Sequence, residues 1–286
     1  PGAWSSEQPI VLASGGGGKN FLNLSMDVLA AAGGSTTPEI TGVDGIETGG
    51  HDPNQRGVTL QNAEIVLEGA VDPYFRGQAN VILQLDENGD SNVELEEAYV
   101  TSTSLPHNLQ VKAGTFFSEF GRLNPQHPHT WDFVDQPLVN GRFLGGDGLR
   151  GPGARVSWLV PAPFYSELFL SVQDSQGETA ASFRNVAGEE IFGRPVQDRP
   201  VRTAGDMLFV PRYAASFDLN DTQTLLVGAS AALGPNATAH APAPVSKSAT
   251  VIRRDARRVP PPPVPRGRSP PRRSPLRRVA WHASSA

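Results

Sequence analysis

The sequence of 286 residues contains no cysteine and only three lysines, Lys19, Lys112 and Lys247. Without thiols the chain forms no disulfide framework, no thiolate metal site and no cysteine nucleophile. No apolar run approaches the roughly 20 residues of a membrane-spanning helix, so any element that spans a membrane has to be a strand. No nucleotide motif, Ser–His–Asp arrangement or paired-acid site is recognisable, and we expect no enzyme.

The charge of the chain is unevenly distributed. Ten arginines and one acid lie from Ile252 onward, so residues 1–251 carry a net charge of about −14. The segment 235–286 holds eleven of the 26 prolines, and such a composition cannot bury enough apolar surface to fold. We therefore expect a disordered Arg/Pro-rich tail over 234–286. Out-of-frame reading of a GC-rich gene would produce the same abrupt change, and we hypothesise that native strands beyond Leu233 are missing.

The remaining sequence is organised in alternating, strand-like runs. Between Phe75 and Asp86 the odd positions are apolar or small and the even positions are polar, with only Ile82 out of place. This period of two is typical of a strand with two different faces. Further runs of this kind are predicted over the following ranges: 22–30, 58–71, 93–103, 109–117, 154–160, 168–172, 209–218 and 225–231.

The lengths of the links between these nine runs alternate. Short links join the second run to the third, the fourth to the fifth, the sixth to the seventh and the eighth to the ninth. Three of the other four links are long. Short turns at one end and long loops at the other are typical of outer-membrane barrels. We therefore predict an all-β fold: an antiparallel up-and-down transmembrane β-barrel, incomplete in this chain, over 21–233. Residues 1–20, with four consecutive glycines, are predicted to be a flexible segment. The chain begins at Pro1 without Met or a leader, which indicates a fragment or a processed form.

Three segments carry a family resemblance. They are 61–75, the acidic strand that includes Glu97-Ala98-Tyr99, and the strand with Lys112-Ala113-Gly114 that leads to Phe120-Gly121. Over roughly 20–233 the chain resembles porin-like outer-membrane proteins near the phosphate-selective porin superfamily. The loop 121–137 resembles a subfamily labelled zinc-regulated, TonB-dependent outer-membrane receptors. The resemblance implies a Gram-negative outer membrane, with lipid, the barrel-insertion machinery and small solutes as partners, a possible homo-oligomer and no nucleic acid.

Polar residues of the alternating runs are the candidates for lining a pore. They are Glu64, Glu68, Arg76, Gln78, Asn80, Gln84, Glu94, Glu96 and Lys112. The excess of carboxylates predicts either a lumen that favours cations or a solvated face balanced by Arg76 and Lys112. The scarcity of lysines disfavours an anion pore.

A second group of polar residues lies in the long loop 118–151. His127 and His129, with Asp132 and Asp135 close behind, are candidate ligands for Zn²⁺ or another divalent ion. The competing interpretation is a polar loop, packed by Trp131 and Phe133, that narrows or caps the pore. The sequence thus predicts a passive channel for small solutes. Two alternatives stay open: a TonB-dependent receptor barrel for a metal or metal chelate, and a secreted soluble β-sandwich that binds a ligand.

Overall fold

The structure is a computed structural model that describes residues 10–18, 20–36, 49, 52, 56–70, 72–85, 91–174, 177–184, 187–188, 190–191, 194–236 and 238. The chain divides into two units, 1–242 and 243–286, and every described residue belongs to the first. Of the predicted tail 234–286, residues 234–236 and 238 are described, and Thr238 forms an isolated antiparallel bridge with Val196. The rest of the tail lies outside the described residues, and the hypothesis of a change of frame stays a prediction.

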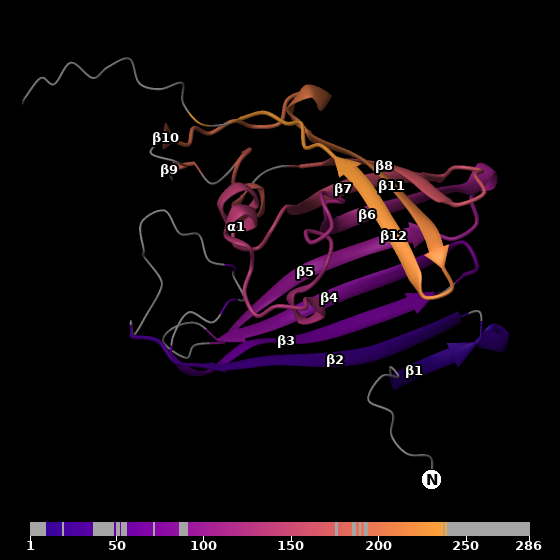
Figure 1. Ribbon diagram of the computed structural model, residues 1–286, viewed down its shortest axis with the longest axis horizontal. Helices are drawn as coiled ribbons and strands as arrows, with labels where there is room; N and C mark the ends of the chain where they lie inside the picture. Colours follow the sequence, from indigo (N-terminus) through magenta and orange to yellow (C-terminus); the bar gives the residue numbers. More distant parts are fainter. Residues whose placement is uncertain are drawn as a thin grey trace, which may run out of the picture. The chain divides into compact units, whose positions relative to one another are not determined.

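The described residues form one antiparallel sheet of ten strands in the order β1-β2-β3-β4-β5-β6-β7-β8-β11-β12, which Figure 1 shows side by side from indigo to orange. Each strand pairs with its neighbours in the chain, except that the two-residue strands β9 and β10 pair only with each other. The strands are β1 Ile10–Gly15, β2 Asn20–Gly33, β3 Gly57–Ala70, β4 Phe75–Leu85, β5 Ser91–Ser102, β6 Leu109–Phe117, β7 Arg150–Leu159, β8 Tyr165–Gln173, β9 Glu190–Ile191, β10 Arg194–Pro195, β11 Leu208–Asn220 and β12 Gln223–Ser230.

All nine predicted strands are present, but the prediction of a flexible segment over 1–20 is wrong for Ile10–Gly15. These residues form β1, which pairs antiparallel with β2. Gly16 and Gly17 have φ values of 58° and 68°, a region that glycine enters without steric cost. The glycine run therefore makes a tight reversal that folds the apolar Ile10-Val11-Leu12 back onto β2. Residues 1–9 lie outside the described part of the chain.

The predicted up-and-down antiparallel order is confirmed, whereas closure into a barrel is not seen. Among the described residues, β1 and β12 are the two edges of the sheet and do not pair with each other. The helices are short: α1 Leu138–Leu144 and the 3₁₀ turns η1 Gly16–Gly18, η2 Pro106–Asn108, η3 Pro128–Thr130, η4 Glu178–Ala180 and η5 Ala204–Asp206. None of the helices in the described ranges is long and apolar enough to cross a membrane.

The two faces of the sheet differ in composition and in burial. The face that carries Phe75, Leu83 and Leu170 is apolar and exposed, with 50%, 37% and 44% of these residues accessible. On the other face, Glu64, Asn80 and many other polar side chains are buried. Ile82, the one apolar residue out of phase in its strand, lies on this buried face and is only 1% exposed. The sheet is therefore apolar outside and polar inside.

The connections are sorted by the two ends of the sheet. The links 71–74, 103–108, 160–164 and 221–222 are short and lie at one end, together with the β1–β2 turn. The links 34–56, 118–149 and 174–207 are long and lie at the other end, together with the short link 86–90. Near the long loops, Leu144, Leu149, Leu208 and Val210 form a small apolar cluster with Ala180. The long loop 118–149, which contains η3 and α1, is the one that builds the candidate site.

Candidate functional site

The predicted pore-lining residues share the polar face of the sheet, on which Glu64 and Asn80 are buried and Arg76 is exposed. Residues directly opposite each other in an antiparallel ladder point to the same side. The register pairs Glu64 with Ile82 and Ile82 with Glu94, so these three side chains lie on one face of the sheet. The residues that regular pairing brings to this face are Glu64, Glu68, Arg76, Gln78, Asn80, Gln84, Glu94 and Lys112.

Glu96 reaches the same face through a β-bulge. Asn80 pairs with Glu97 and Val81 pairs with Leu95, so Glu96 is an additional residue with no partner position in β4. A bulge redirects side chains that strict alternation would send to opposite faces. As a result the adjacent Glu96 and Glu97 are both buried, at 2% and 5% exposure. β5 thus contributes two neighbouring carboxylates to one site.

The loop 118–149 crosses this polar face and is held to strands on both sides of it. At its start, Gly121 N–H donates to Ser230 Oγ in β12 at 2.8 Å. Further along, the Gln61 amide in β3 donates to the Val134 carbonyl oxygen at 3.3 Å. Its two ends are joined by Asn124, whose amide donates to the carbonyl oxygen of Leu149 and whose Oδ1 accepts from Leu149 N–H. The loop therefore covers the polar side chains of the sheet.

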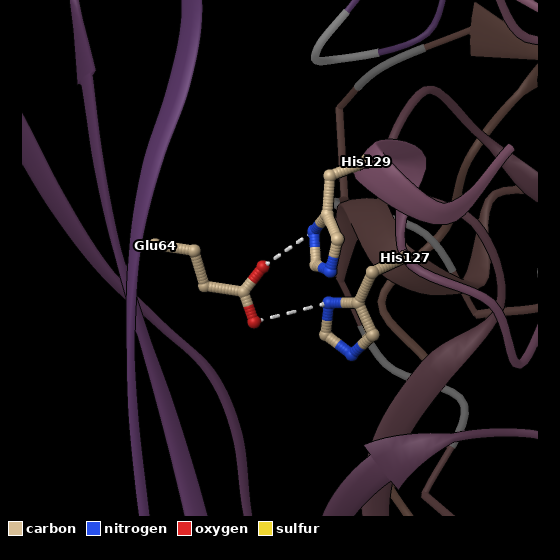
Figure 2. Close-up of side chains that lie close together, drawn as sticks. All are labelled: Glu64, His127 and His129. Atoms are coloured by element: carbon tan, nitrogen blue, oxygen red, sulfur yellow. Dashed lines mark ion pairs between the residues drawn. The ribbon is translucent and has the colours of Figure 1, made fainter. Parts of the chain in front are cut away.

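Between these anchors the loop brings two histidines against the buried Glu64, as Figure 2 shows. His127 Nδ1 lies 3.4 Å from Glu64 Oε1, and His129 Nδ1 lies 3.0 Å from Glu64 Oε2. Candidate ligand atoms of the three residues all lie within 4.8 Å of one another. Yet Glu64 Oε2 and both Nδ1 atoms make no hydrogen bond of acceptable geometry within the described ranges. Close polar atoms without directed hydrogen bonds are the main feature of this site.

The surrounding groups hold the three side chains in place. Asn80 Nδ2 donates to Glu64 Oε1, the oxygen that His129 does not approach. Glu97 Oε2 lies 2.9 Å from His127 Nε2, and Glu97 Oε1 accepts from Phe117 N–H at 2.9 Å. Because Nε2 of His127 is occupied by Glu97, its Nδ1 is left facing Glu64 and Glu96, the latter at 2.8 Å. The orientation of His127 is thereby fixed.

Three buried carboxylates in one cluster require positive charge nearby. Burial alone would lower the pKa of His127, but its contacts with Glu64, Glu96 and Glu97 outweigh burial and raise that pKa to about 12. The site is thus an acidic pocket with two imidazoles. Its carboxylate oxygens are donors for a cation, and the His127 nitrogen becomes one when a metal ion displaces its proton. Nothing in this arrangement resembles a nucleophile with its general base.

The predicted ligand set is reproduced in part. The structure brings His127 and His129 together, whereas Asp132 and Asp135 are exposed and are not in the group. The carboxylate that joins the histidines is Glu64, which sequence reasoning assigned only to the lumen. Glu97 is named by the sequence analysis only as part of the acidic strand that carries the family resemblance. The signal that points to it is the Glu96-Glu97 pair itself, which breaks the alternation of β5.

The other half of the polar face is basic and paired. Arg155 Nη1 lies 2.7 Å from Glu119 Oε1, and Arg212 Nη1 lies 3.6 Å from Glu119 Oε2. Arg150 pairs with Glu94, and Lys112 Nζ lies 4.1 Å above the ring of Tyr99. The polar face therefore has an acidic region on β3–β5 and a basic region on β7–β11.

Comparison with known proteins identifies a relative without a described function. The chain is 42% identical over 190 residues to an uncharacterized protein of Aquifex aeolicus (strain VF5), and the match covers 65% of this chain. The chain spans about two fifths of the length of that relative, 38%. No protein family matches the chain, and no solved structure matches it.

Proposed function

We propose that the chain is part of a porin-like β-barrel in a bacterial outer membrane and that small solutes diffuse through its polar interior. The observation that carries this proposal is the inversion of the sheet. An exposed apolar face opposite a buried polar face suits lipid outside and a wet lumen inside. In water, a soluble protein would bury the apolar face instead.

Two further features support placement in a bilayer. All the long loops lie at one end and only short links lie at the other, as in outer-membrane barrels. Near the short links, five exposed aromatic side chains gather, and such rings favour the boundary between lipid and water. They are Tyr74, Phe75, Trp158, Phe164 and Phe217. A closed barrel needs further strands that pair with the edge strands β1 and β12, because an open sheet edge is not tolerated in lipid.

Within this barrel the loop 118–149 is the constriction. It lies over the polar face and leaves the acidic region of Glu64, Glu96 and Glu97 on one side of the path. The basic side chains Arg155 and Arg212 are neutralised in part by Glu119 of the same loop. We therefore expect modest selectivity for cations, which steric and electrostatic effects produce without any reaction.

The experiment is fractionation followed by conductance measurements. The expressed chain should sediment with membranes, resist extraction by carbonate and dissolve only in detergent. After reconstitution in planar bilayers, a salt gradient should give a reversal potential of the sign expected for cations. A chain that is monodisperse in buffer without detergent would overturn the proposal, and so would vesicles that remain tight to small solutes at high protein content.

A receptor barrel for a metal or metal chelate is the second candidate. The observation that favours it is the histidine and glutamate group on the loop. It predicts saturable, energy-dependent uptake in cells, whereas a passive pore gives uptake that is linear in solute concentration. The soluble β-sandwich has less support, because a sandwich packs two apolar faces together and the described residues form one large sheet with its apolar face exposed.

A further inference from the structure

We propose that Glu64, His127 and His129 bind a divalent transition-metal ion of the zinc class, and that this ion fastens the loop 118–149 to strand β3. Glu64 comes from strand β3, and the two histidines come from the loop. No other group of His, Asp or Glu among the described residues brings three ligand atoms as close together. The metal would therefore join two parts of the fold that lie more than sixty residues apart in the sequence.

The spacing of the donor atoms agrees with this assignment. Four ligands bound at 2.0–2.1 Å in a tetrahedron lie roughly 3.3 Å from one another. In the structure the nitrogen and oxygen atoms are 3.4 Å apart for His127 and Glu64, and 3.0 Å apart for His129 and Glu64. Glu96 Oε2, at 2.8 Å from His127 Nδ1, is placed to be a fourth donor. Each nitrogen–oxygen distance is thus in the range of neighbouring ligands of one ion, although the histidines face different oxygens of Glu64 and the whole group spans up to 4.8 Å, so binding would draw the ligand atoms closer together.

The unsatisfied atoms point in the same direction. Glu64 is fully buried, and its Oε2 accepts no hydrogen bond in the described part of the chain. The Nδ1 atoms of both histidines likewise lack a directed hydrogen bond within these ranges. A buried polar atom that is left unsatisfied costs about 1–3 kcal/mol, and a bound cation would satisfy all three together.

The groups behind the ligands are those that metal sites use. A histidine that binds through one ring nitrogen commonly donates from the other to a carboxylate, which fixes the tautomer. Glu97 is in that position, 2.9 Å from His127 Nε2. The Asn80 amide holds Glu64 in the same way. Imidazole with carboxylate suits zinc and its first-row neighbours better than calcium or magnesium, which prefer oxygen alone.

Zinc titration of the full chain in detergent, by calorimetry and by competition with a chromogenic chelator, tests the site. The wild type should bind one zinc ion per chain. His129→Ala and Glu64→Gln should each weaken binding by at least about 100-fold, since removal of a ligand exceeds the 10- to 100-fold effect of an outer-shell change. The control variants Asp132→Asn, Asp135→Asn and His107→Ala should bind like the wild type.

Two results would overturn the site: absence of stoichiometric zinc binding by the wild type, or equal affinity in His129→Ala. His129 retains 23% side-chain exposure, so its truncation disturbs packing less than a change at Glu64. Circular dichroism of each variant shows whether the sheet is retained.

Protease protection measures the fastening of the loop. Zinc should slow tryptic cleavage after the exposed Arg122 by tenfold or more in the wild type and leave the rate in His129→Ala unchanged. Equal rates with and without zinc in the wild type would contradict the fastening. An effect of zinc on conductance rests on the proposed channel function, whereas affinity and protection do not. Failure of the channel proposal would therefore leave these two readouts intact, and failure of the zinc site would leave the passive pore intact.

Discussion

An arginine placed on the apolar face of β8 separates a lipid-facing sheet from a water-facing one. Leu170 lies in the middle third of β8, on the exposed face, and is 44% accessible. Leu109, on the same face and 38% accessible, is the first residue of β6, beside a short turn. The two leucines are thus matched in type, face and exposure and differ in their distance from the end of the strand.

The two environments predict different free energies. At the middle of a bilayer an arginine on the lipid face costs about 2–4 kcal/mol, and near the interface about 0–1 kcal/mol. Leu170→Arg should therefore destabilise the chain by about 2–3 kcal/mol more than Leu109→Arg. At 1.4 kcal/mol per factor of ten, this is roughly a 30- to 150-fold difference in the folding equilibrium. If water covers this face, both exposed substitutions stay within about 0.5 kcal/mol of the wild type.

The assay is reversible guanidinium unfolding of the chain in phospholipid vesicles, followed by tryptophan fluorescence. Two single variants, Leu170→Ala and Leu109→Ala, are the controls. Each removes apolar area without adding a charge. Equal free energies of unfolding for Leu170→Arg and Leu109→Arg would refute the assignment of this face to lipid, whatever the conductance of the chain.

Three further predictions concern the sheet and its loops. In Gly153→Ala the new Cβ would lie 2.2 Å from a carbonyl oxygen of β8, so heat-modifiable folded protein should be lost on gels, whereas Gly205→Ala, with its nearest atom at 3.5 Å, should fold. Asn124→Ala removes three buried hydrogen bonds, and denaturant unfolding should show a loss of about 3 kcal/mol, at about 1 kcal/mol each. Backbone N–H groups of the turn before Asp206 lower its pKa. The carboxylate of Asp206 therefore stabilises the fold fully above the ordinary aspartate pKa of about 3.9. This stabilisation is lost as the pH falls through the lower pKa of the folded state. The melting temperatures of the wild type and Asp206→Asn should therefore converge on acidification.

The strands and the two faces follow from local chemistry, and for that reason the sequence predicts them well. Alternation in 75–84 places each side chain on the correct face, and even Ile82, out of phase in the sequence, lies where its even position requires. Strand β1 was missed because glycine was taken as a sign of flexibility. Gly16 and Gly17 instead use their positive φ to reverse the chain. Glycine permits both outcomes, and only the partner strand decides between them.

The candidate site depends on contacts between distant residues, which alternation does not encode. The spacing of His127 and His129 indicates a shared partner, but the nearest acids in the sequence, Asp132 and Asp135, point into solvent. The partner is Glu64, and two non-local conditions place it there: the register of β3 against β4, and the path of a loop that begins after β6. The bulge at Glu96 is visible as a break in the alternation. The face to which Glu96 points, however, is set by its neighbours Glu97 and Leu95, which pair with Asn80 and Val81.

The position of the loop follows from complementary charges rather than from apolar burial. The described apolar cluster is small and lies at one side of the loop. Across the polar face the loop presents Glu119 to Arg155 and Arg212, and it presents His127 and His129 to the acidic region around Glu64. An inverted loop would bring Glu119 to the carboxylates and the imidazoles to the guanidinium groups, and buried like charges cost several kcal/mol. The same charges therefore orient the loop and, at its histidine end, create the pocket in which a cation is favoured.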